Sequence, residues 1–373
     1  MSETWWWGTY PEAGAGSPTG AGEGIWVMAP GGLAVRAIAL SAPAFVVAHP
    51  DLQVLYAVTD TQPSEFLCLD VSDVARPAVL DRVPTGGSGA CHLLLSRDTL
   101  TAYVTHGSTG EVAVVPLGPD GRIATSGPTQ VLGGQGAGPP FMAAPVGGER
   151  GVAGQGSSAI PDHPSGLCAH FAGYGPTGSV LLVCDAGADL IRRFEVLADG
   201  SLRADGVAAH LPAGSAPRRF AIRDDVIYVT CEGDDTLAAL RWDPMARAAA
   251  LLASTPMAPI PSRRGEAVHV AHVIAVSGVL LASFVGSDVI EVFDLGGDGL
   301  PTYRAAFDSG GAFPRYFAVT GEQLVVGNEK SHLVSVFDLA DVLAIEGAED
   351  PVGFSSLPHA DVAMTSPACV AFG

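Results

Sequence analysis

One unit recurs six times along the 373 residues, and this repeat restricts the possible folds more than any other feature of the sequence. Each copy has an apolar strand that opens on or near Pro or His, a turn, a second strand that ends in a polar residue, another turn and a third strand. The copies begin at Pro43, Cys91, His163, Pro217, His269 and Pro314. Short strands with tight turns, repeated about every 50 residues, are typical of β-propeller blades, which have four strands each.

The two ends of the chain carry strands that lack partners. Segment 368–372 is a single apolar strand left over after the sixth copy, whereas the strands expected at 5–10 and 24–28 have no inner strand of their own. If the two ends build one blade together, the ring closes and no edge is left open. We therefore predict an all-β fold, a single seven-bladed β-propeller domain over residues 1–373, with the last blade closed by the N- and C-terminal strands and a Gly/Pro-rich insertion at about 118–162.

The composition supports this fold and excludes several kinds of partner. The chain has 47 Gly and 28 Pro, which is far too many turn-formers for a helical bundle. Its formal net charge is −20 and no segment gathers Lys or Arg into a stripe, so nucleic acid is not expected as a partner. An acidic Glu3 near the start and the lack of an apolar run of ~18 residues predict a cytoplasmic protein with no membrane partner. The oligomeric state stays open.

The six cysteines are scattered along the chain without any Cys-x-x-Cys pair. This spacing indicates buried thiols and not a disulfide framework or a zinc site. His269 and His272 are three apart, which places them on opposite faces of a strand and disfavours a metal pair. We therefore expect no metal site and no cofactor. The segment from Gly173 to Gly178 fits G-x-G-x-x-G, but it joins two strands of one copy and is interpreted as a hairpin turn.

The blade geometry selects the candidate site residues. The inner strand of each blade lines the channel and the second strand returns antiparallel, so the start of the first and the end of the second lie at the same face. Titratable side chains recur at these two positions. The candidates are His92 with His106, His163 with Asp185, Arg218 with Glu232, His272 with Ser283, and Arg315 with Glu329.

Arg218 and Glu232 form the tightest of these pairs. They are 14 positions apart and joined by one hairpin, so we expect their side chains to be within reach of each other. One interpretation is a structural ion pair at the corner of a blade. The functional interpretation is an arginine that binds an anionic group of a substrate beside a carboxylate that transfers protons.

Several segments resemble a known family. Leu55-Tyr56-Ala57-Val58 and the openings at Pro217-Arg218 and Pro314-Arg315 are similar to segments of the β-propeller lactonase family, whose openings read Pro-Arg-His. This family contains the propeller-type 6-phosphogluconolactonases and the carboxymuconate lactonizing enzyme. The resemblance implies that His163, Arg218 and Glu232 are the catalytic residues. A second arginine of the family is replaced here by Val285, which makes a doubly anionic substrate less expected.

We therefore expect a lactonase that hydrolyses a sugar-acid or similar carboxylated lactone without a metal. Arg218 would bind the anion, and Glu232 or His163 would activate water. The remaining candidates would contact the substrate: His92, His106, Asp185, His272, Arg315 and Glu329.

Three alternatives stay open. The first is a muconate-type cycloisomerase that forms a lactone. The second is a non-catalytic propeller that binds a small ligand or a protein, for which the tryptophans at 5–7 would be an anchor if they point outward and do not pack between blades. The third is a metal-dependent propeller of the gluconolactonase type, whose activity chelators would abolish.

Overall fold

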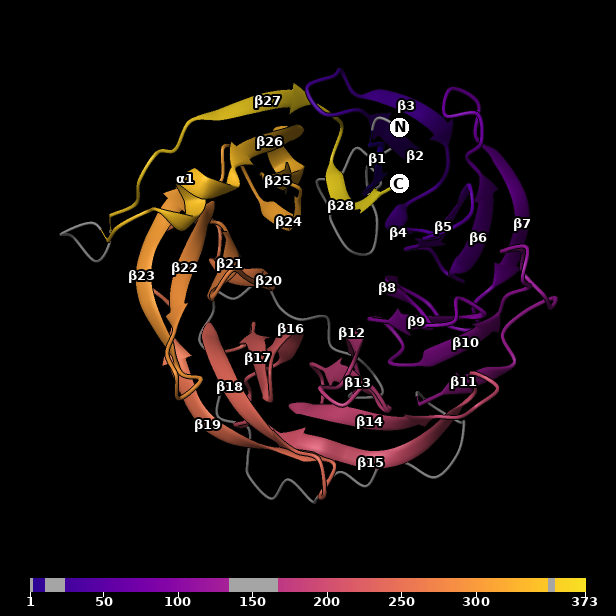
Figure 1. Cartoon of the computed structure of the whole chain (residues 1–373), viewed down its shortest axis with the longest axis horizontal. Coiled ribbons are helices and arrows are strands. Elements are labelled where there is room, and N and C mark those ends of the chain that lie inside the picture. The colour runs from indigo at the N-terminus through magenta and orange to yellow at the C-terminus, as the bar shows by residue number, and fades with distance from the viewer. Residues whose placement is uncertain (1–2, 11–23, 134–166, 348–352) are drawn as a thin grey trace.

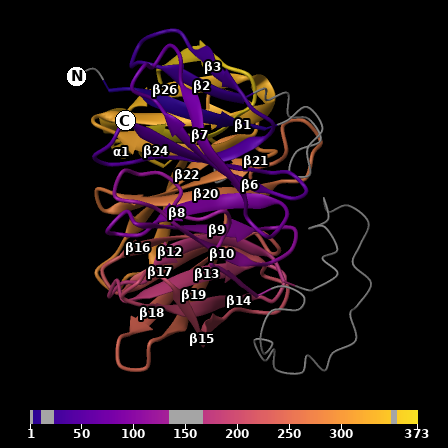
Figure 2. The same cartoon turned by 90° about the vertical axis from the view of Figure 1, so that its right-hand side faces the viewer.

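The computed structural model describes residues 3–10, 24–133, 167–347 and 353–373, and these residues form a ring of seven four-stranded antiparallel sheets around a central channel (Figure 1). The sheets are the blades of a propeller, and the chain passes around the ring in sequence order. Seen from the side, the ring is edge-on, and the strands of its blades run between the two faces of the ring (Figure 2). The predicted seven-bladed β-propeller is confirmed.

Each blade begins at the channel and ends at the rim. Blades 1 and 2 contain β4 (Pro43–Ala48), β5 (Val54–Thr59), β6 (Glu65–Asp70), β7 (Ala78–Pro84), β8 (Ala90–Leu95), β9 (Thr101–His106), β10 (Val112–Pro116) and β11 (Gln130–Leu132). Blades 3 and 4 contain β12 (Ala169–Tyr174), β13 (Val180–Asp185), β14 (Leu190–Val196), β15 (Leu202–His210), β16 (Pro217–Arg223), β17 (Val226–Cys231), β18 (Thr236–Asp243) and β19 (Ala248–Pro256). Blades 5 and 6 contain β20 (His269–Val276), β21 (Val279–Val285), β22 (Val289–Leu295), β23 (Pro301–Asp308), β24 (Pro314–Thr320), β25 (Gln323–Asn328), β26 (Leu333–Asp338) and β27 (His359–Ala363).

The two ends of the chain close the ring in blade 7. This blade has the strand order β28 (Pro367–Phe372), β1 (Trp5–Thr9), β2 (Gly24–Met28) and β3 (Val35–Ala39), so the C-terminal strand is the innermost one. Trp5 and Trp7 are buried in a cluster with Val325 of blade 6, whereas Trp6 is buried with Phe45 of blade 1. The tryptophans therefore alternate between the two neighbouring blades, and none of them is an exposed anchor.

Every inner strand has the same irregularity near its start. After the first residue, or after the second in β20, the register with the second strand shifts by one, which leaves one residue of the inner strand unmatched. Such a β-bulge re-aims the side chains around it. The seven unmatched residues are Ala44, Cys91, His170, Arg218, Ala271, Arg315 and Ala368. The residues that follow them are Phe45, His92, Phe171, Arg219, His272, Tyr316 and Cys369, and we call these seven the channel belt.

A few features complete the fold. A single turn of 3-10 helix (Glu329–Ser331) follows β25, and the short α1 (Leu339–Leu343) follows β26. The first part of the expected insertion at 118–162 contains β11, and the rest lies outside the described residues. All six cysteines are free and five of them are buried, as their spacing predicted. No helix in the described part of the chain is long and apolar enough to cross a membrane.

Candidate active site in the channel

The predicted contact between Arg218 and Glu232 is present in blade 4. Arg218 is the bulged residue of β16, and Glu232 directly follows β17, with its backbone N–H bonded to the Ala216 carbonyl at 3.0 Å. Nη1 of Arg218 donates to Oε2 of Glu232. The two side chains keep 13% and 22% of their surface exposed, so the pair is accessible to a small molecule. Nε of Arg218 is buried and has no hydrogen-bond partner among the described residues.

The same two positions in blade 6 hold Arg315 and Glu329. Nη1 of Arg315 is 3.2 Å from Oε2 of Glu329, whose side chain is fully buried. Nη2 of Arg315 donates to Oη of Tyr10 at 2.6 Å, and the guanidinium lies 3.9 Å from the centre of that ring. Tyr10 follows β1 in blade 7, so this cluster joins blade 6 to blade 7. Burial, partly opposed by Arg315, raises the pKa of Tyr10 to about 12, which keeps the phenol neutral.

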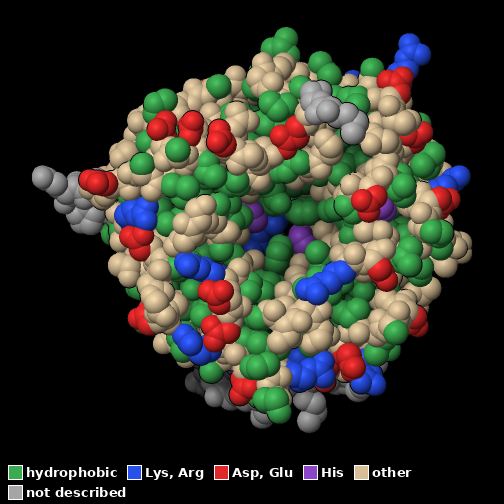
Figure 3. Space-filling model, in the orientation of Figure 1, with side chains coloured by type: hydrophobic (Ala, Val, Ile, Leu, Met, Phe, Trp, Pro, Cys, Tyr) green, Lys and Arg blue, Asp and Glu red, His purple; other side chains and the backbone are tan. Residues whose placement is uncertain are grey.

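The channel belt lies one residue further along the inner strands. The guanidinium carbon of Arg219 is 5.7, 5.5 and 5.4 Å from the ring centres of Phe45, Phe171 and Tyr316, which come from blades 1, 3 and 6. His92 lies 4.3 Å from the ring of Phe171. Rings from several blades therefore close around one charged group. In the space-filling view, histidine and basic side chains gather in the central hollow between hydrophobic ones (Figure 3).

Three histidines of this region are held neutral. The pKa values of His92, His170 and His272 lie well below the usual range, because burial penalises the imidazolium and Arg219 adds a like charge. Asp60 follows β5 at the position that Glu232 has in blade 4. Burial raises its pKa, and Arg315 opposes this shift. Such imidazoles stay uncharged beside the arginines and can donate or accept a hydrogen bond, but they are poor proton acceptors.

Two predicted residues point away from the channel. His106 pairs with the first residue of its inner strand, and its Nε2 is 2.7 Å from Oγ1 of Thr85. Asp185 is fully buried, with Oδ2 3.1 Å from Nε of Arg192. His106 therefore contacts Thr85 in the connection between blades 1 and 2, and Asp185 contacts Arg192 within blade 3. His163, predicted to be catalytic, lies outside the described residues.

His170 and Arg219 are channel residues that the sequence reasoning missed. His170 is the bulged residue of β12, and the charge of Arg218 contributes to its low pKa. Arg219 directly follows Arg218, at the place where the family openings have His. The second arginine of the segment Pro-Arg-Arg-Phe was the signal that could have identified Arg219 as a channel residue. In a strand with strict alternation, however, Arg219 would point to the opposite face from Arg218, so it was not selected.

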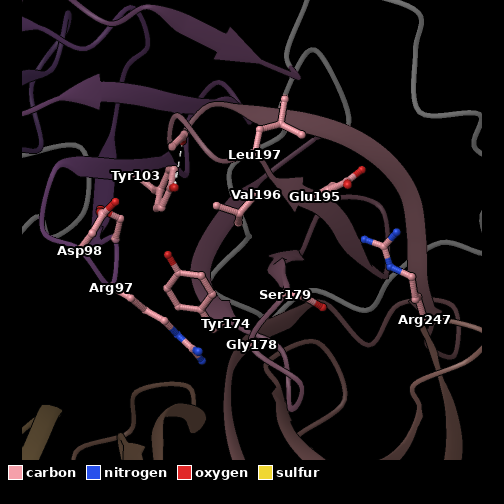
Figure 4. A pocket seen from close by; sticks show the side chains of 12 residues that line it. Arg97, Asp98, Tyr103, Tyr174, Gly178, Ser179, Glu195, Val196, Leu197 and Arg247 are labelled. Atoms are coloured by element: carbon pink, nitrogen blue, oxygen red, sulfur yellow. Dashed lines mark hydrogen bonds between the residues drawn. The ribbon is translucent and has the colours of Figure 1, made fainter.

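A second hollow lies between blades 2 and 3, at the turns after the inner strands (Figure 4). Its volume is about 500 Å³, and Arg97 lies over the ring of Tyr174 at 4.9 Å. None of the residues selected from the sequence lines it. It is at the opposite ends of the inner strands from the bulged residues, so it is separate from the Arg218–Glu232 pair. Among the described residues, no three His, Cys, Asp or Glu side chains are placed to hold a metal ion.

Comparison with known proteins identifies the family. A model of the family described as "Lactonase, 7-bladed beta-propeller" matches residues 28–342, well over half of the chain. The chain belongs to this lactonase family. A search of curated proteins found no match to the sequence.

Three solved structures match this chain over almost its full length. The periplasmic gluconolactonase of Pseudomonas aeruginosa is 21% identical with a TM-score of 0.75, and the match covers 100% of this chain and 99% of that one. A Bacteroides uniformis protein provisionally assigned as a 6-phosphogluconolactonase is 21% identical with a TM-score of 0.76, at the same coverage. A protein from Lactobacillus plantarum is 19% identical with a TM-score of 0.76, and both chains are covered fully. At these identities the likeness shows the fold and not the substrate.

Proposed function

We propose that this member of the lactonase family hydrolyses a lactone that carries a carboxylate, such as a sugar-acid lactone, at the Arg218–Glu232 pair. The observation that carries the proposal is the partly exposed contact between these two side chains at the channel, with Nε of Arg218 left without a partner. A carboxylate beside a guanidinium that still has free N–H groups supplies both a base and an electrophilic donor.

The reaction needs one proton to move twice. The Glu232 carboxylate takes a proton from water as the water oxygen bonds to the lactone carbonyl carbon, and N–H groups of Arg218 stabilise the negative oxygen that forms. The ring C–O bond then breaks, and protonated Glu232 returns its proton to the leaving oxygen. The product is an open-chain hydroxy acid, which loses its carboxyl proton to solvent. His163, which lies outside the described residues, is a further candidate for moving a proton.

The test is a pH-indicator screen for hydrolysis over aldarolactones such as glucarolactone, which keep a free carboxylate, and over aldonolactones, phosphoaldonolactones and simple γ- and δ-lactones, with and without EDTA. We expect turnover of a carboxylated or sugar-acid lactone that resists EDTA and disappears in Glu232→Gln. Glu322→Gln, which changes an exposed glutamate in the turn after β24, at the opposite end of that strand from Arg315, is the matched control. Loss of activity in EDTA would point to a metal-dependent site. Silence across the panel from a folded protein would overturn the hydrolytic proposal and favour a cycloisomerase or a binding role.

A further inference from the structure

Arg219 is a buried cation that lacks an acceptor within the described part of the chain. Only 7% of the residue is exposed, and both Nε and Nη1 are buried without a hydrogen-bond partner. No carboxylate among the described residues forms an ion pair with it. Its surroundings are the three aromatic rings of the channel belt, which attract a cation but accept no N–H hydrogen bond in the plane of the guanidinium.

The neighbouring charges do not compensate Arg219. Arg218 contacts Glu232 and Arg315 contacts Glu329, so each of these carboxylates already has another guanidinium beside it. The belt histidines are neutral, and the charge of Asp60 interacts with Arg315. Within the described residues, Arg219 therefore keeps its positive charge without an ion-pair partner. An unpaired buried charge is costly, and an entering anion would remove most of that cost.

The position of Arg219 relates this charge to the proposed chemistry. It follows Arg218 in β16, and the bulge at Arg218 lets both consecutive side chains reach the channel. Each of the two arginines contributes to the low pKa of His170, so both lie close to that ring. Val285 stands where the family has a second arginine, which predicts a site with one cation fewer than in the family. Arg219, on β16, supplies a second cation beside Arg218.

We propose that Arg219 binds a carboxylate of the ligand at the base of the channel, while Arg218 and Glu232 face its lactone group. This assignment rests on the proposed function for the lactone, but the binding of an anion does not require turnover. The planar guanidinium, held between rings, presents donors in a fixed fork that suits a carboxylate. The ligand class is therefore an organic acid, a lactone with a carboxylate outside the ester or its hydroxy-acid product.

The first test measures binding without any reaction. Wild-type protein in chloride-free buffer is titrated calorimetrically with D-glucarate, the hydroxy acid that a carboxylated sugar lactone yields, and with sorbitol, an uncharged counterpart. We expect saturable binding of glucarate, no binding of sorbitol, and at least a tenfold weaker glucarate affinity in Arg219→Gln. Arg223→Gln changes an exposed arginine of the same strand and should bind as the wild type does. Equal binding of glucarate by wild type and a folded Arg219→Gln would overturn the proposal.

A second measurement keeps the test valid if Arg219→Gln does not fold. Crystals of the wild type are soaked in bromide, and we expect an anomalous peak beside the Arg219 guanidinium; a channel without such a peak would contradict the assignment. Where lactone turnover exists, Arg219→Gln should raise KM for carboxylated lactones at least tenfold and leave uncharged lactones unchanged. Glucarate binding that depends on Arg219 in a protein without turnover would uphold the anion site and reject the lactonase function alone.

Discussion

The two arginine–glutamate pairs of blades 4 and 6 occupy equivalent positions but differ in their surroundings. In both blades the arginine is the bulged residue of the inner strand and the glutamate follows the second strand 14 residues later. The blade 6 pair is closed, because Glu329 is fully buried and Arg315 also donates to Tyr10 of blade 7. The blade 4 pair is open, because 22% of Glu232 is exposed and Nε of Arg218 has no partner.

This difference separates a structural use of one motif from a functional use. A guanidinium whose donors are already engaged by a carboxylate and a phenol has little left to offer a ligand, and it fixes the contact between two blades. A guanidinium with unused donors beside a solvent-reachable carboxylate can still bind and react. The comparison therefore teaches that, among the described residues, the same bulge and spacing leave guanidinium donors available to a ligand where the neighbouring blade supplies no further partner.

The largest expected effect is on turnover. Arg218→Gln should lower kcat for the lactone by about 10²–10³-fold, or about 3–4 kcal/mol, because it removes the donors that stabilise the oxyanion. Urea unfolding should change little, since the pair is partly exposed. Steady-state kinetics and unfolding on the same preparation make the check. A folded Arg218→Gln with unchanged kcat would remove Arg218 from the mechanism.

The equivalent change in blade 6 should act mainly on stability. Arg315→Gln leaves Glu329 buried without its cation, and removing one partner of such a pair costs about 3 kcal/mol. We expect a lower urea midpoint and far less loss of turnover than in Arg218→Gln.

The control for this prediction is Arg223→Gln, which removes an exposed arginine and should leave the midpoint in place. If Arg315→Gln lost turnover as Arg218→Gln does while staying as stable as the wild type, the distinction between the two pairs would be wrong, and Arg315 would be a substrate contact.

The sequence was enough to predict the fold and the two pairs. Six copies of one unit and an unpaired strand at the C-terminus determined the number of blades, and the burial of Trp5 and Trp7 against one neighbour and Trp6 against the other shows why the closure is stable. The spacing of Arg218 and Glu232 on one hairpin was also sufficient, because the two residues lie near each other across the hairpin with or without the bulge.

The local errors come from the bulge. In blade 3, Asp185 pairs with the first residue of β12 and turns between blades, whereas the position equivalent to Glu232 is the next residue, Ala186. A shift of one residue moves a side chain to the other face of a strand, so His106 was misplaced for the same reason. No pattern in the sequence predicts an unmatched residue near the start of every inner strand. Arg219 was missed because it directly follows such a residue, Arg218.

The smallest expected effect concerns the contact that closes the blade 6 pair. Tyr10→Phe removes the hydroxyl that accepts from Arg315 but keeps the ring against the guanidinium, so we expect a loss of about 1.5 kcal/mol in unfolding free energy. Combined with Arg315→Gln, the two losses should not add, because both variants remove the same interaction. The losses of unfolding free energy from Tyr10→Phe and Arg218→Gln should add, because Tyr10 contacts the Arg315–Glu329 pair and not the Arg218–Glu232 pair. A double-mutant cycle in urea measures both couplings. If Tyr10 were coupled to Arg218 as strongly as to Arg315, the two arginine–glutamate pairs would form one network. The partial exposure of the blade 4 pair would then depend on the buried contacts of the blade 6 pair.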